Sequence, residues 1–145
     1  MLTTKEERAE RRGVVRYNGS MNENRAELVV DISKRFMDLL RQLDPRWKAG
    51  YLRFEMDSMR QGCTASYDIG SDVLLIAAAE NAAFFDHIGK QGRKFLHNLG
   101  KAKGVFLLVV DSSCKYNFYF EFEDLERWTI SVSGGSTGRP VDLPG

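Results

Sequence analysis

Residues 105–128 read VFLLVVDSSCKYNFYFEFEDLERW and contain two apolar runs. The first run, Val105–Val110, is apolar at every position, which is typical of a strand covered on both faces. A short polar segment, Asp111–Lys115, separates it from a second run, Asn117–Glu123. The two runs therefore predict an antiparallel hairpin joined by a loop of a few residues.

The second run alternates strictly, which indicates a strand with one buried face. The face predicted to enter the core carries three aromatic residues, Phe118, Phe120 and Phe122. The opposite face carries polar residues, Tyr119, Glu121 and Glu123. We expect this polar face to point outward or into a shallow cleft, so any functional surface of the hairpin should lie there.

Composition narrows the class of protein. The chain has 145 residues, 43% of them hydrophobic, and a net charge of +1. These values suit one domain with a sizeable core, and the charge by itself does not favour nucleic acid as a partner. There is no run of about 18 apolar residues, and the charged N-terminus has no apolar signal segment. We therefore expect no membrane span and a cytoplasmic protein.

Outside the hairpin, the apolar spacing predicts two helices and three further strands. Asn24–Leu43 has apolar residues at helical spacing and ends before Pro45. A second helix is expected over Ala77–Leu99, with a break around its two glycines, Gly89 and Gly92. The remaining strands are expected over Trp47–Asp57, Cys63–Ile69 and Val73–Ile76, and Thr129–Ser133 adds a possible short one.

This order of elements predicts an α/β (α+β) fold. We expect a mostly antiparallel sheet of about five strands, with two helices packed on one face. Residues 1–23 are polar and are expected to form a loosely ordered lead-in. Residues 24–133 form the single α/β domain, and residues 134–145, rich in Gly, Ser and Pro, are expected to be a flexible tail.

Catalytic signatures are absent from the sequence. It has no nucleophile elbow, phosphate-binding loop, dinucleotide fingerprint or zinc-protease motif. His87 and His97 have no sequence neighbour that suggests a catalytic triad, and Cys63 and Cys114 lack the spacing of zinc ligands. We therefore predict no catalytic residue, no metal site and no cofactor.

Carboxylates are the most conspicuous candidate site. Six of them follow two predicted strands: Glu55, Asp57, Glu121, Glu123, Asp124 and Glu126. If the two strands are neighbours, these side chains form one acidic surface. Such a surface is compatible with an ordinary solvated sheet face, with docking of a basic partner, or with a divalent-metal site for phosphodiester chemistry.

A basic set offers a second reading. It consists of Lys90, Arg93, Lys94, Lys101 and Lys103, in and after the second predicted helix. These side chains suit contacts with phosphate, but without interleaved exposed aromatic residues they are more often a solvated helix face.

The order of three short segments resembles the YezG-like family of immunity proteins, which neutralise toxins delivered between bacteria. The first is the helix that ends at Asp44-Pro45-Arg46-Trp47, and the second is the strand Tyr51-Leu52-Arg53-Phe54-Glu55 that follows. The third is the late aromatic and acidic stretch, residues 117–125. The similarity covers roughly Asn22–Trp128.

The resemblance implies a cytoplasmic immunity protein that binds a cognate toxin, of nuclease type, in stoichiometric amounts. Binding needs a stable scaffold and a complementary surface, and no catalytic residue. A basic nuclease cleft suits the acidic residues above, with Tyr119 as an aromatic anchor. Two alternatives stay open: a small metal-dependent enzyme that uses the acidic strand residues, and an adaptor or nucleic-acid-binding module that uses the Lys90–Lys103 surface.

Overall fold

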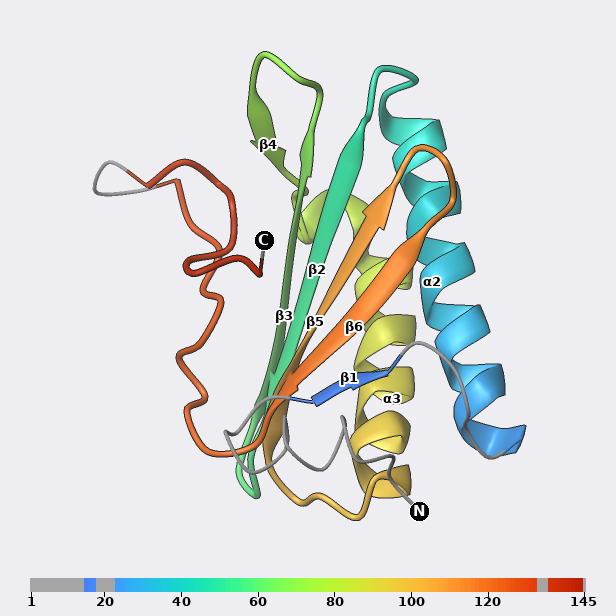
Figure 1. Ribbon diagram of the computed structural model, residues 1–145, viewed down its shortest axis with the longest axis vertical. Helices are drawn as coiled ribbons and strands as arrows, with labels where there is room; N and C mark the ends of the chain where they lie inside the picture. Colours follow the sequence, from blue (N-terminus) through green and yellow to red (C-terminus); the bar gives the residue numbers. More distant parts are fainter. Residues whose placement is uncertain (1–14, 18–22, 133–135, 145) are drawn as a thin grey trace.

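The computed structural model describes residues 15–17, 23–132 and 136–144 of the chain. It shows an antiparallel sheet of six strands in the order β1-β6-β5-β2-β3-β4, with two long helices on one face (Figure 1). The predicted α+β class, with two helices on one face of an antiparallel sheet, is confirmed. The additional strand, β1, lies in the predicted lead-in; the rest of that lead-in, apart from Glu23, falls outside the described residues.

The strands are β1 (Val15–Tyr17), β2 (Ala49–Met56), β3 (Gln61–Asp68), β4 (Val73–Leu75), β5 (Gly104–Asp111) and β6 (Tyr116–Glu121). The helices are α2 (Glu23–Leu43) and α3 (Ala82–Asn98), and a 3-10 turn, η1 (Ala79–Asn81), precedes α3. Each predicted element is present except the short strand over Thr129–Ser133. The described part of that segment, residues 129–132, is irregular.

Helix α3 is continuous through its two glycines, so the predicted break is wrong. A β-carbon built on Gly92 would lie 2.8 Å from the ring of Phe54 on β2. The missing side chain therefore lets the helix approach the sheet closely, and this close approach compensates for the low helix propensity of glycine.

The core lies between the helices and the face of the sheet turned toward them, which we call the back face. Phe118 and Phe120 of β6 are fully buried there, as the alternation predicts. Phe95 of α3 contacts both rings edge-on, each at 5.3 Å between ring centroids. Leu40 and Phe36 of α2 pack over Gly50 of β2. Phe95 thus joins α3 to the aromatic face of β6, and Leu40 and Phe36 join α2 to β2.

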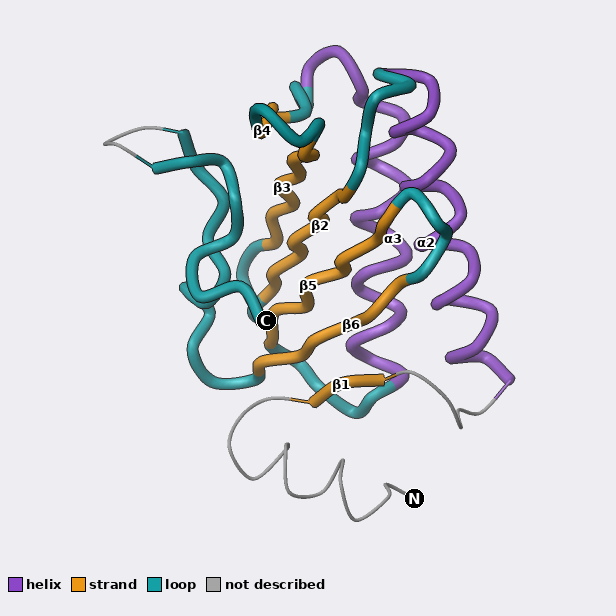
Figure 2. The backbone as a smooth tube through the Cα atoms, turned by 45° about the horizontal axis from the view of Figure 1, so that its top comes forward, coloured by secondary structure: helices purple, strands orange, loops and turns teal. Residues whose placement is uncertain are grey.

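The opposite face of the sheet, which we call the front face, is covered by the chain that follows β6. Trp128 and Ile130 of this chain pack on Tyr51, Val105 and Leu107 of the sheet. Figure 2 shows this chain as loops on the side of the sheet away from the helices. Because of this covering, Val105–Val110 of β5 is enclosed on both faces, as its continuous apolar run predicts.

Residues 136–144, assigned to the tail in the sequence, are tied to this same segment. The amide of Gly138 donates to the carbonyl of Ser131, at 2.8 Å, and the amide of Val141 donates to Thr129, at 3.1 Å. The hydroxyl of Ser66 on β3 donates to the carbonyl of Gly138 at 2.7 Å. These contacts place the residues against the front face.

A polar cluster joins the two helices. Asp31 of α2 accepts hydrogen bonds from His87 and Gln91 of α3, at 2.7 and 2.8 Å, and from Arg35 of its own helix, at 3.0 Å. Partial burial raises the pKa of Asp31, but these three hydrogen bonds outweigh burial and lower the pKa from 3.8 to about 2. The ionised carboxylate is therefore favoured by folding.

Asp31→Asn should lower the free energy of unfolding by about 1 kcal/mol at neutral pH, because the variant loses the charged acceptor. The folded pKa lies below the unfolded value, so this stabilisation is present above pH 3.8 and is lost as the pH falls toward about 2. Urea unfolding of both proteins at neutral pH and near pH 2.5 measures the difference. Asp38→Asn is the matched control, since its pair with Arg41 is exposed and should contribute less than about 0.5 kcal/mol. Equal stability of Asp31→Asn and wild type at neutral pH would contradict the assignment.

Candidate functional site

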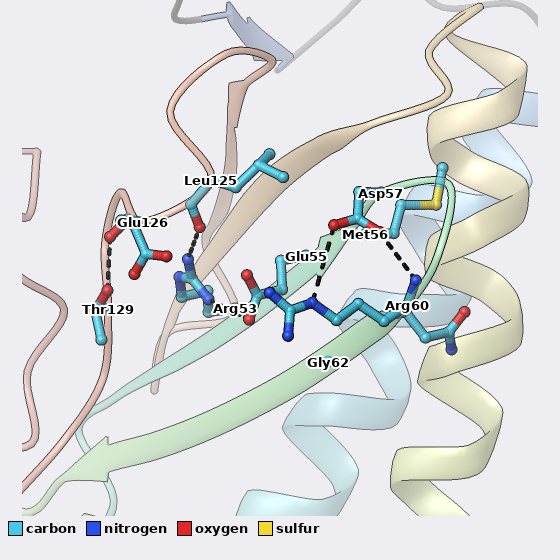
Figure 3. A pocket seen from close by; sticks show the side chains of 10 residues that line it. Arg53, Glu55, Met56, Asp57, Arg60, Gly62, Leu125, Glu126 and Thr129 are labelled. Carbon is cyan, nitrogen blue, oxygen red and sulfur yellow. Dashed lines mark hydrogen bonds and ion pairs between the residues drawn. The ribbon is translucent and has the colours of Figure 1, made fainter.

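A polar cavity of about 340 Å³ opens on the front face (Figure 3). One wall comes from the β2–β3 hairpin and the other from the segment after β6. We call it the front cavity, and its lining residues are Arg53, Glu55, Met56, Asp57, Arg60, Gln61, Gly62, Leu125, Glu126 and Thr129. It is formed because alternate residues of β2 face this side and the segment 125–129 crosses above them.

Arg53 fastens that segment to the sheet. Its side chain is only 6% exposed. The guanidinium donates to the carbonyl of Arg127 at 2.8 Å and to the carbonyl of Leu125, and lies 3.3 Å from a carboxylate oxygen of Glu55. Buried arginine is stable only when its donors are satisfied, and here carbonyls and one carboxylate satisfy them. Arg53 therefore shapes the cavity wall, and most of its hydrogen-bonding capacity is used internally.

Alternation along β2 does not predict this role, because it indicates only that Arg53 lies on the side of the strand opposite Leu52 and Phe54. The sequence signal was indirect: a single arginine stands between apolar and aromatic neighbours, two residues from Glu55. The partners that bury it come from residues 125–127, more than 70 positions later in the chain.

Glu121 does not face solvent, so that expectation is wrong. Its side chain is 7% exposed and pairs with Arg127 at 2.8 Å. It also accepts hydrogen bonds from the backbone amides of Glu123 and Asp124, at 3.2 and 3.3 Å. These contacts fix the turn after β6, and they remove Glu121 from the set of groups available to a partner.

Three of the predicted carboxylates do come together at the front cavity: Glu55, Asp57 and Glu126. The side chain of Glu55 is 40% exposed. Asp57 accepts the amides of Met59 and Arg60, at 2.7 and 2.9 Å, and these backbone hydrogen bonds lower its pKa below the usual value. Glu126 lies on the opposite wall and is exposed. The cavity therefore presents anionic groups on two walls.

The remaining predicted residues lie outside the cavity lining. Glu123 and Asp124 are exposed in the turn after β6, where Asp124 accepts the amide of Glu126 at 3.0 Å. Tyr119 is half-buried beside Trp128, with 6.3 Å between the ring centroids. The predicted acidic face is thus divided into a cavity, an internal ion pair and an exposed turn.

The predicted basic set is also divided. Lys90 and Arg93 line a second cavity of about 320 Å³, which we call the helix-side cavity, together with Gln61, Phe85, Asp86 and Gly89. Arg93 donates to the side-chain carbonyl of Gln61 at 2.9 Å. Lys101 instead lies 4.5 Å from the ring centroid of Phe122. Lys94 and Lys103 are exposed.

Other groups with potential chemistry are placed as follows. Burial raises the pKa of the Cys63 thiol to about 12. Cys114 is exposed in the β5–β6 loop, with the guanidinium of Arg41 at 3.4 Å from its sulfur. Within residues 15–17, 23–132 and 136–144, no group of three or more His, Cys, Asp or Glu side chains is placed to hold a metal ion.

No model of a protein family matches the chain, and no curated protein matches it either. None of the helices in the described part of the chain has the length and apolar character needed to cross a membrane.

Proposed function

We propose that this protein is an immunity protein that binds and neutralises a cognate bacterial toxin in stoichiometric amounts. The observation that carries the proposal is the front cavity, where Glu55, Asp57 and Glu126 face a common space. This shape and charge suit a basic group on the surface of a partner protein. The resemblance of the chain to immunity proteins supports the same reading.

Electrostatics favours a basic partner. Arg53 lines the cavity, but carbonyl groups and Glu55 already engage its guanidinium. Arg60 lies near Asp57 at 3.9 Å, a long pair with a highly exposed arginine that contributes little. Glu126, together with the solvent-exposed parts of Glu55 and Asp57, is therefore the group available to an incoming cation. A nuclease toxin, whose substrate-binding cleft is basic, would match this pattern.

Coexpression with a candidate toxin, chosen from the genes next to the one that encodes this protein, tests the proposal. We expect the cells to survive only when this protein is present, and the two purified proteins to form a complex of fixed stoichiometry. Survival without a complex, or no protection at all, would contradict direct neutralisation.

A turnover assay separates the enzyme alternative. The purified protein, supplied with Mg²⁺ or Mn²⁺ and with DNA, RNA or small phosphodiesters, should show no activity above background. Activity that disappears in Glu55→Gln would instead favour a metal-dependent enzyme.

A further inference from the structure

Strand β3 has a free edge along its first half. On one side it pairs with β2 over its whole length, Gln61–Asp68. On the other side, β4 pairs only with Ser66–Asp68, and one further bond joins the amide of Ile76 to the carbonyl of Ala65. No strand among the described residues pairs with the outer side of residues 61–64.

The register identifies which backbone groups point outward. The carbonyl of Ala65 accepts from Ile76, so it points away from β2. In an antiparallel strand the N–H and C=O of one residue point to the same side, and the side alternates along the chain. Cys63 and Gln61 therefore direct their amides and carbonyls outward. The carbonyl of Arg60 accepts a hydrogen bond from the amide of Asp57, which follows β2, so it points toward β2. Arg60 and Gln61 therefore point to opposite sides, as the alternation requires.

Two cavities flank this free edge, one on each face of the sheet. Gln61 and Gly62 line the front cavity, and Gln61 also lines the helix-side cavity. Side chains of a strand point alternately to the two faces. A strand added beside residues 61–64 would therefore send alternate side chains toward the front cavity and toward the helix-side cavity.

We propose that this edge binds an extended segment of a partner protein by strand addition, with a lysine or arginine side chain directed into the front cavity. Backbone groups of Gln61 and Cys63 would supply the hydrogen bonds, and Glu55, Asp57 and Glu126 would select the cation. The inference deepens the proposed function, on which it rests, since it states how the basic partner is held.

The charge of the chain argues against a second copy as the occupant. Pairing of two β3 edges would bring residues 61–64 of one copy beside those of the other, and this segment reads QGCT. Arg60, which precedes this segment, already lies near Asp57 in the front cavity of its own copy, so residues 61–64 of a second copy add no cationic side chain. Self-pairing would also bring two sets of carboxylates near each other, and like charges oppose such contact.

Nuclear magnetic resonance with synthetic peptides tests the proposal without the toxin. The probe is a capped pentapeptide, Thr-Lys-Val-Lys-Thr, whose two lysines share one face when extended. The matched control peptide is Thr-Glu-Val-Glu-Thr. We expect the lysine peptide to shift the amide resonances of Gln61 and Cys63 and to slow their hydrogen exchange, and the glutamate peptide to bind at least about tenfold more weakly.

A backbone variant separates strand addition from simple charge attraction. Cys63→Pro removes an amide that points away from β2, a position where proline is tolerated on an edge strand. Cys63→Ser keeps the amide and is the matched control. We expect Cys63→Pro to lose peptide binding by at least about tenfold and Cys63→Ser to retain it. If Cys63→Pro does not fold, the shifts of the Gln61 and Cys63 amides in the wild-type protein decide whether the peptide binds at the edge of β3.

Three outcomes would overturn the inference: equal binding of the two peptides, shifts confined to the Lys90–Lys103 surface, or a concentration-dependent dimer that protects Gln61 and Cys63. If neither peptide binds at the edge of β3, the strand-addition inference is wrong, but the proposal that the protein neutralises a toxin is unaffected. If the lysine peptide binds at the edge of β3 but the protein does not protect cells, strand addition is supported and the proposed function is wrong.

Discussion

Phe120→Ala should lower the free energy of unfolding by about 3–5 kcal/mol, the range for a fully buried phenylalanine. Phe120 is fully buried, and its ring contacts Phe95, Phe106 and Phe118. Truncation leaves a cavity that these rings cannot fill, because each is held by its own strand or helix. Urea unfolding, with the slope checked for two-state behaviour, measures the loss.

Phe122→Ala is the matched control for this experiment. Phe122 follows Phe120 on the same face, just after the end of β6, and its ring stacks on that of Phe120. It is only half-buried. We expect a loss of about 1–2 kcal/mol for this variant. A loss below about 1 kcal/mol for Phe120→Ala would mean that the aromatic face of β6 does not form the core.

The back-face core was predictable because its signals are local. Alternation in β6 and the helical spacing of α2 each specify which residues face inward, and the two patterns agree. The packing of Gly92 against Phe54 was not predictable, because glycine lowers helix propensity in any isolated segment. Only the neighbouring strand explains why the helix continues there.

The covered front face was the main feature that sequence reasoning missed. Tyr51 alternates with residues of the back face, and on the front face it is buried under Trp128 and Ile130. The covering segment is irregular, and the hydrogen bonds from Arg53 that hold it join residues more than 70 positions apart in the chain. Local periodicity carries no information about such long-range coverage.

The same limit explains the partial success at the candidate site. Glu121 was assigned correctly to the front-facing side of β6, but its partner Arg127 lies in a turn whose path the sequence does not specify. Glu55, Asp57 and Glu126 are among the carboxylates predicted to form one acidic surface. Their convergence on one cavity depends on the crossing of residues 125–129 above β2.

Charge changes in the front cavity should have the largest effect on binding of the toxin. The informative variant combines Glu126→Lys with Glu55→Gln, because a lysine at position 55 would lie beside the buried Arg53 and disturb the fold. Glutamine at position 55 keeps an acceptor oxygen beside Arg53, and Glu121 is left intact because it belongs to an internal ion pair outside the cavity lining. Removing and reversing desolvated charges at an interface costs about 2–5 kcal/mol, which corresponds to a loss of affinity of at least about 30-fold.

The matched control must change the net charge by the same amount as the cavity variant, but at a different surface of the protein. Glu27→Lys combined with Glu80→Gln does so, since both residues are exposed and neither lines the front cavity. We expect this control to alter mainly the association rate, and that effect should fade at high salt. The cavity variant should instead dissociate faster from the toxin at every salt concentration and fail to protect cells, with circular dichroism showing that both variants are folded. If the two variants bind equally well, charge in the front cavity does not select the partner, and the docking surface lies elsewhere on the molecule.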